Sequence, residues 1–279
     1  MITDEIKEKY DSMSKTQKKI ASYIVQYPTD VSYQSVKALS REVKVSEASI
    51  IRFCSFLGYE GFPELKKALQ GEAKAKNSMQ NRIQASYAAY GEKKEGVAKV
   101  FQDDINRIAL TLENLNMEDF SKVCSEMILA KRIFIVAARS AASLGTFFSY
   151  YLNMALNKVC LITDNSGCSD AMADVGRGDM VVGITFQRYS TFTVSLFQYA
   201  AEHKAVTVAI TDMELSPVVK NADYCFYAET AMPTYLDSFA APLSLINAFL
   251  TEIGRMRNVE LEHRVTELDE FYNRYHIFE

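Results

Sequence analysis

The feature of this chain that most restricts its fold is a set of five short apolar runs in its C-terminal half, separated by segments of helical periodicity. The runs are Arg132–Ala137, Lys158–Thr163, Asp179–Thr185, Ala205–Thr211 and Ala222–Tyr227. Strands that are almost continuously Val and Ile are buried on both faces, which requires a parallel sheet with helices on both sides. We therefore predict an α/β three-layer domain with a five-stranded parallel sheet.

Two loops of this sheet are expected to meet at a ligand site. With five strands we expect the flavodoxin-like order 2-1-3-4-5, in which the order reverses between the first and third strands. The loops beyond those strands are residues 137–140 (AARS) and 185–191 (TFQRYST). Each loop ends a strand and opens a helix, so free backbone N–H groups face one crevice.

The side chains of the two loops suit an anion. Hydroxyl groups can donate to phosphate or carboxylate oxygens, and an arginine can add a bidentate pair. The candidate effector-binding residues are Arg139, Ser140, Thr185, Gln187, Arg188, Ser190 and Thr191. Serine and threonine also cap helices, and capping alone would explain each hydroxyl taken singly. Together, at the reversal of strand order, they predict an anion site.

The N-terminal quarter predicts a helix, a tight turn and a second helix between Ser35 and Gly58. The first helix has an apolar stripe at i, i+3 and i+7, and the second at i, i+3, i+4 and i+7. These stripes are Val36, Leu39 and Val43, then Ile50, Phe53, Cys54 and Leu57. A further helix at Thr16–Tyr27, ended by Pro28, completes a three-helix unit. This arrangement is typical of helix-turn-helix domains that bind double-stranded DNA.

The outward face of the second helix is small and basic, as a major-groove contact requires. The candidate DNA-binding residues are Ser46, Ala48, Ser49, Arg52 and Ser55, with Lys66 and Lys67 near phosphates. Between residues 13 and 75 ten Lys and Arg stand against six Asp and Glu, although the whole chain has a net charge of −4. The alternative is an ordinary helical hairpin in a globular core.

The same stretch resembles the N-terminal domain of RpiR-type bacterial transcription regulators. The resemblance rests on the turn Leu39–Ser46, the pair Arg52-Phe53 and, above all, the run Leu57–Lys66 (LGYEGFPELK). Such regulators carry a C-terminal SIS domain that senses sugar phosphates. The resemblance therefore implies the same for residues 117–258, where Ile210-Thr211-Asp212, Ser216-Pro217 and Ala222-Asp223 are similar to SIS sequences.

One departure from the SIS pattern concerns glycine. SIS domains usually have Gly-x-Gly-(x)-Ser in the first loop, where this chain has Ala137, Ala138 and Arg139 before Ser140. The second loop has Thr185 and Gln187 where two serines are usual. A side chain here occupies space that glycine leaves to the ligand. The anion is therefore expected to be a phosphate compensated by Arg188, or else a carboxylate.

The predicted domains are 1–75, the helix-turn-helix domain; 76–116, a helical linker; 117–258, the SIS-type domain; and 259–279, an amphipathic helix that covers its own core or pairs with a second subunit. The chain has no signal peptide or membrane span, so we expect a cytoplasmic protein. Its five cysteines and three histidines lack metal-ligand spacing, and no cofactor or metal is expected.

The sequence thus predicts a homodimeric or larger DNA-binding regulator that senses a small anionic carbohydrate, with no catalytic residues. Neither loop offers the Glu or His base that an aldose–ketose isomerase needs. A sugar-phosphate isomerase or binding enzyme with an appended helical domain is the alternative, and a scaffolding module without a ligand is a third reading.

Overall fold

The computed structural model describes residues 2–76, 79–91, 94–164 and 169–278. The chain divides into two compact units: Met1–Glu92 with Pro233–Tyr235, and Lys93–Met232 with Leu236–Glu279. The predicted linker is split between them, because its first helix belongs to the first unit and its second helix to the other.

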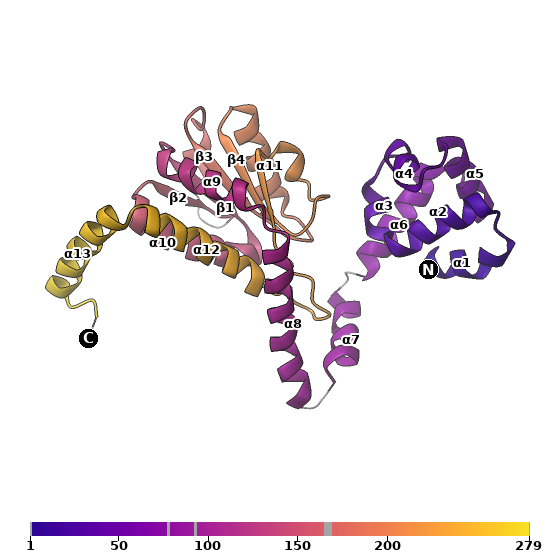
Figure 1. The fold of residues 1–279 in the computed structure, drawn as a ribbon, viewed down its shortest axis with the longest axis horizontal. Helices are drawn as coiled ribbons and strands as arrows, with labels where there is room; N and C mark the ends of the chain where they lie inside the picture. Colours follow the sequence, from indigo (N-terminus) through magenta and orange to yellow (C-terminus); the bar gives the residue numbers. More distant parts are fainter. Residues whose placement is uncertain (1, 77–78, 92–93, 165–168, 279) are drawn as a thin grey trace. The chain divides into compact units, whose positions relative to one another are not determined.

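The first unit is helical throughout its described residues (Figure 1). Its elements are α1 (Ile2–Lys9), η1 (Tyr10–Ser12), α2 (Lys15–Gln26), α3 (Pro28–Tyr33), α4 (Val36–Val43), α5 (Glu47–Leu57), α6 (Phe62–Lys76) and α7 (Met79–Tyr90). A single apolar core joins α1 to α6, and the stripes predicted for α4 and α5 lie in it. The helix-turn-helix is α4, the turn and α5.

Local signals fix the ends of these helices as the sequence predicts. The side chain of Ser35 accepts a hydrogen bond from the backbone N–H of Ala38, and Ser46 accepts one from Ser49, so each caps its helix. Gly58 ends α5 in the left-handed conformation, with φ of 102°. The turn is entered through Lys44, which is itself left-handed at φ 56°.

One detail of this unit differs from the predictions. Pro28 does not simply end a helix, because it opens α3, where a proline fits the first turn. The core also extends to the N-terminal helix, since Ile2 and Ile6 of α1 are buried in it.

The second unit contains the predicted parallel sheet, with the order β2-β1-β3-β4-β5. Its elements are α8 (Lys94–Glu113), α9 (Met117–Leu129), β1 (Ile133–Ala137), η2 (Arg139–Ala141), α10 (Ala142–Leu156), β2 (Val159–Ile162), η3 (Ser169–Met172), β3 (Met180–Ile184), α11 (Thr191–Glu202), β4 (Val206–Thr211), η4 (Val219–Asn221), β5 (Tyr224–Tyr227), α12 (Ala240–Met256) and α13 (Asn258–Tyr275). The predicted fold class, strands and order are confirmed.

Alternating strand residues supply the two faces of the sheet. In β1, Ile133 and Ile135 pack into a core with α9, α10 and α12, whereas Phe134 and Val136 pack into a second core with α11. Helix α10 lies so close to β1 that a Cβ on Gly145 would meet the Cβ of Ala137 at 2.9 Å. The three layers bring the carboxyl ends of β1 and β3 side by side, since these strands are paired.

Candidate functional site

A cavity lies at the carboxyl ends of β1 and β3, where the sequence predicts the anion site. Its volume is about 380 Å³ with the open mouth included. The residues that line it are Ala138, Arg139, Ser140, Ala141, Thr185, Phe186, Gln187, Arg188, Ser190, Asp237 and Phe239. Six of the seven predicted effector-binding residues are therefore brought together. The seventh, Thr191, is an exposed residue in the first turn of α11 and does not line the cavity.

Both arginines of the cavity have left-handed backbone conformations. The φ angle is 56° at Arg139 and 68° at Arg188. The left-handed region costs a residue with a side chain about 1–2 kcal/mol relative to the right-handed helical region. An arginine thus takes the left-handed conformation in the first loop, where the SIS pattern usually has glycine, and the second loop also has a left-handed arginine. Strain of this kind persists where the surrounding structure imposes it, commonly at binding sites.

The two guanidinium groups have no ion-pair partner within the described residues, since no ion pair there joins Arg139 or Arg188 to a carboxylate. The carboxylate of Asp164 does lie near, but it accepts a 3.4 Å hydrogen bond from the backbone N–H of Arg139. An anionic ligand is what this pair of exposed cations can hold.

The second loop is held in place by Asp212, at the end of β4. Its carboxylate accepts hydrogen bonds from the backbone N–H of Gln187 at 3.1 Å and from the hydroxyl of Tyr189 at 2.9 Å. Burial raises the pKa of Asp212, and these hydrogen bonds oppose that rise without cancelling it. A third bond runs from the backbone N–H of Ser190 to the buried hydroxyl of Thr185. The buried Thr185 hydroxyl therefore helps to fix the conformation of the loop.

The helix-capping explanation holds in part for the predicted hydroxyls. Ser190 caps α11 by accepting from the N–H of Thr193 at 3.5 Å, a long bond that leaves its lone pairs and proton available. Ser140 makes no side-chain cap, since η2 has none and its carbonyl rather than its hydroxyl accepts from Ser143. The Ser140 hydroxyl is thus the better candidate for a ligand contact.

Besides the loops after β1 and β3, a third segment lines the cavity through Asp237 and Phe239, and the sequence analysis did not predict it. We call this segment the third wall of the cavity. Both lie just before α12, in a segment without helix or strand that is fixed by α8. The hydroxyl of Ser238 donates to Asp104 at 2.5 Å, and Arg107 donates to the carbonyl of Ala231 at 2.7 Å. No motif marks this segment. The one available signal was an acidic residue beside a serine at the start of an apolar helix.

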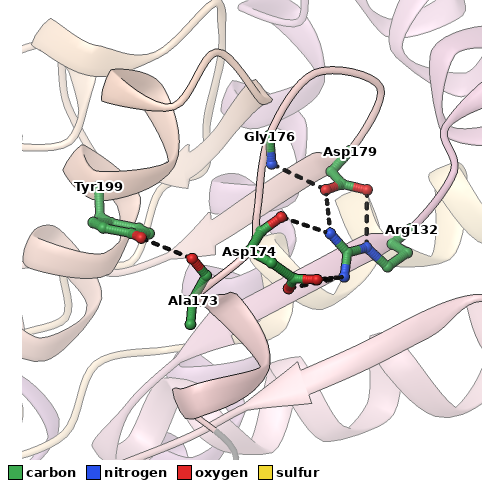
Figure 2. Close-up of polar contacts among 6 residues, drawn as sticks. All are labelled: Arg132, Ala173, Asp174, Gly176, Asp179 and Tyr199. Carbon is green, nitrogen blue, oxygen red and sulfur yellow. Dashed lines mark hydrogen bonds and ion pairs between the residues drawn. The ribbon is translucent and has the colours of Figure 1, made fainter.

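The opposite edge of the sheet has an arginine of a different kind (Figure 2). Arg132 precedes β1, and its guanidinium donates to the carboxylate of Asp179 at 2.6 and 3.0 Å and to that of Asp174 at 3.1 and 3.2 Å. Asp179 also accepts from the N–H of Gly176, while Tyr199 donates to the carbonyl of Ala173. These contacts clamp the connection that leads into β3, and they serve the fold.

In the first unit, the predicted DNA-binding residues of α5 form one exposed polar surface. The hydroxyls of Ser46 and Ser49 lie 2.8 Å apart, and Arg52 donates to Ser49 at 3.2 Å. Ala48, Arg52 and Ser55 are exposed. Ile51, also exposed at 47%, was missed by the prediction and stands beside them outside the buried stripe. An apolar side chain at such a place can contact a thymine methyl group.

The two lysines predicted to lie near phosphates differ in their surroundings. The amino group of Lys66 donates to the carbonyls of Tyr33 and Gln34 at 3.1 and 3.0 Å, so it caps the end of α3. Lys67 is exposed. Of the two, Lys67 is therefore the better candidate for a phosphate contact.

The fold and these two surfaces define a helix-turn-helix protein joined to a sugar-isomerase-type domain. Residues 1–76 match the helix-turn-helix domain of the rpiR family, and residues 126–252 match the SIS domain. The chain belongs to the RpiR family of transcriptional regulators, as the sequence resemblance indicates.

The relatives agree with this assignment over most of the chain. An uncharacterized HTH-type transcriptional regulator of Haemophilus influenzae is 28% identical over 80% of this chain and 78% of its own length. The regulator HexR of Escherichia coli is 22% identical over 96% of this chain and 92% of its own.

Two solved structures share the fold with a TM-score of 0.60 each. The sugar isomerase domain of an RpiR transcription factor from Sphaerobacter thermophilus is 24% identical and covers 62% of this chain and 97% of its own. The Vibrio vulnificus NanR protein, solved in complex with ManNAc-6P, is 18% identical and covers 99% of both chains.

No helix among the described residues is long and apolar enough to cross a membrane. No group of three or more His, Cys, Asp or Glu side chains among them could hold a metal ion.

Proposed function

We propose that this regulator binds operator DNA through the exposed face of α5 and senses an anionic sugar in the cavity at the carboxyl ends of β1 and β3. The observation that carries the effector proposal is the pair Arg139 and Arg188, which stand at one cavity on left-handed backbone without a carboxylate partner among the described residues. The DNA proposal rests on α5 and on the family.

The lining of the cavity favours a ligand with an anion at one end and hydroxyl groups at the other. The arginines and the Ser140 hydroxyl can bind a phosphate or a carboxylate. Asp237 lines the same cavity and repels an anion, but its carboxylate can accept hydrogen bonds from sugar hydroxyls. The phosphorylated ligand of the NanR structure is consistent with a sugar phosphate, which we propose as the effector class here.

Calorimetry on one sugar in phosphorylated and unphosphorylated form tests this proposal. The wild-type protein is expected to prefer the phosphorylated form. Arg188→Ala should weaken its binding by about 1.5–3 kcal/mol, the range for a hydrogen bond to a charged group, and leave the weak binding of the neutral sugar unchanged. A matched control is Arg177→Ala, since Arg177 is outside the cavity lining. A preference for the neutral sugar would contradict a phosphate site.

DNA binding is tested by two substitutions in the first unit. Arg52→Ala should weaken operator binding by about 1–3 kcal/mol and relax sequence preference, because an arginine can read a guanine edge. Lys67→Ala should weaken cognate and scrambled duplexes equally and flatten the salt dependence. Wild-type affinity of Arg52→Ala for the operator would show that α5 is not the recognition helix.

We also propose a homodimer, because one α5 alone would bind a short site weakly. A symmetric dimer would read half-sites about 10 base pairs, or a multiple of that, apart. Light scattering of the protein at the concentration that saturates the operator tests this, and a monomeric mass there would contradict it.

One observation favours the alternative function, a sugar-phosphate isomerase. Asp237 is a carboxylate in the cavity that could serve as the base of such an enzyme. An assay of hexose and amino-sugar phosphates with the wild type and Asp237→Asn decides the matter. We expect no turnover by either protein. Turnover by the wild type that Asp237→Asn abolishes would identify an enzyme instead.

A further inference from the structure

Helix α8 presents a continuous apolar stripe to solvent. The exposed fractions of the five side chains are 63% for Val97, 67% for Phe101, 58% for Ile105, 36% for Ile108 and 66% for Leu112. Their spacing of four, four, three and four residues places them on one side of an α-helix. Large apolar side chains scattered singly on a surface need no explanation, but a stripe along a whole helix does.

Three polar residues of the same helix face its own domain. Asp104 accepts a hydrogen bond from Ser238, Arg107 donates to the carbonyl of Ala231, and the hydroxyl of Thr111 accepts one from the N–H of Glu229. A surface helix ordinarily turns its apolar stripe inward and its polar residues outward. In α8 these three polar residues lie inward while the apolar stripe is exposed, which indicates that another surface covers the stripe.

We propose that the stripe of α8 docks against the same stripe of a second copy of this chain, in antiparallel orientation. The pairs Val97 and Leu112, and Phe101 and Ile108, are each symmetric about the point between residues 104 and 105. In an antiparallel pair, Val97 of each copy meets Leu112 of the other, Phe101 meets Ile108, and Ile105 lies near its own equivalent. A two-fold interface requires this self-complementarity, because each residue must fit its partner in both directions.

The area of the stripe suits a dimer. From their exposed fractions, the five side chains offer about 500 Å² in each copy, and thus about 1,000 Å² in total, which is the lower bound for a specific interface. Burial of that apolar area would contribute favourably, at about 25 cal/mol per Å², before the entropy of association is subtracted. The dimer should therefore be specific but sensitive to a single charge.

The residues that flank the stripe favour a second copy over other partners. On one side of the stripe Ala98, Gln102 and Ala109 are exposed and uncharged. On the other side Asp104 and Arg107 carry opposite charges 3.8 Å apart, which limits like-charge repulsion between two identical helices. A helix that lies on an anionic membrane surface would instead carry Lys and Arg beside its apolar face. The two alanines also let the helices approach closely.

Light scattering of charge variants tests the proposal. Ile105→Glu would place two carboxylates near each other at the two-fold axis, so we expect the mass of a monomer where the wild type has that of a dimer. The matched control is Leu110→Glu, since Leu110 is 47% exposed on the same helix but away from the stripe. We expect this control to remain dimeric. A dimeric Ile105→Glu, or a monomeric wild type, would overturn the proposal.

Cysteine cross-linking is an independent test of the interface that introduces no charge into the stripe. Ile105→Cys should form a covalent dimer on mild oxidation, and a mixture of Val97→Cys and Leu112→Cys should form the mixed dimer. Val97→Cys alone should form no more than the wild-type protein, which controls for the native thiols. Cross-linking of Val97→Cys alone would indicate a parallel pair and contradict the proposed orientation.

The proposal rests on the proposed function only in its expectation of two DNA-binding domains. Effector binding is therefore measured calorimetrically on the same variants. Monomeric Ile105→Glu that still binds the sugar phosphate would support the α8 interface and the effector site together. If the wild type binds the effector as a monomer, the interface fails and the effector proposal stands.

Discussion

The two edges of the sheet place arginines at opposite ends of the same strands and use them differently. At the amino edge Arg132 is bonded to the carboxylates of Asp179 and Asp174 (Figure 2). At the carboxyl edge Arg139 and Arg188 have no ion-pair partner among the described residues and line a cavity. The difference shows that an arginine here is structural where the protein supplies its counter-charge, and a candidate ligand contact where it does not.

Backbone conformation separates the two edges in the same way. Arg139 and Arg188 are left-handed, whereas Arg132 is not among the residues of positive φ. The carboxyl edge thus combines arginines without an ion-pair partner among the described residues with local strain, and the strain acts against stability. Substitutions at the two edges should therefore change stability in opposite directions, which gives the comparison its tests.

The largest effect is expected at the amino edge. Asp179→Ala removes the carboxylate that holds Arg132 and the N–H of Gly176, and should lower the free energy of unfolding by about 2–3 kcal/mol. Chemical denaturation measures it. Asp174→Ala is the matched control, because its side chain is 77% exposed and such an ion pair contributes about 0–1 kcal/mol. If both variants lost the same free energy of unfolding, the buried Asp179 would not be more important to the fold than the exposed Asp174.

The amino edge also shows which features of the fold could be predicted from the sequence and which could not. The five strands could be predicted because each carries its own apolar signal in Val and Ile, and their order followed from the arrangement that five-stranded parallel sheets commonly adopt. The partnership of Arg132 with Asp179 could not be predicted, since the two residues are 47 positions apart and meet only when β1 pairs with β3. The candidate site divides likewise: strand-end loops are marked in sequence, and Asp237 is not.

At the carboxyl edge we expect a gain in stability with a loss of binding. Glycine adopts the left-handed conformation without strain, so Arg188→Gly should raise the free energy of unfolding by about 1 kcal/mol. The greater conformational entropy of glycine in the unfolded chain reduces this gain. The same variant should bind the phosphorylated sugar at least tenfold more weakly. Thermal unfolding and calorimetry on one preparation measure both. A stability loss like that of Asp179→Ala would mean that Arg188 is structural.

A smaller effect is expected from the segment that forms the third wall of the cavity. Ser238→Ala removes the hydrogen bond to Asp104 and should weaken effector binding by about 1 kcal/mol through the position of Asp237 and Phe239. The control is Ser244→Ala, whose hydroxyl only donates to the carbonyl of Ala240 within α12. If both variants bind the effector as the wild type does, the segment is not part of the site.

The smallest expected effect is a difference between the two edges in how the free energy of unfolding depends on pH. Burial alone would raise the pKa of Asp179, but hydrogen bonds from Arg132 and Gly176 outweigh it and hold the pKa below its usual value. Its stabilisation is therefore present above the unfolded pKa of about 4 and is lost as the pH falls through the folded pKa. Burial raises the pKa of Asp212, so the sign is opposite. The ionised form costs stability, and the cost grows as the pH rises from about 4 through the folded pKa.

The test compares the free energy of unfolding of two variants with that of the wild type between pH 3 and pH 7, roughly the window that these shifts span. The stability difference between Asp179→Asn and the wild type should be largest at neutral pH and should vanish in acid. Asp212→Asn should show the opposite slope, faring better relative to the wild type as the pH rises, because the amide carries no charge to bury. Parallel curves for the two variants would mean that the two carboxylates are equivalent, and that the electrostatic difference between the edges is wrong.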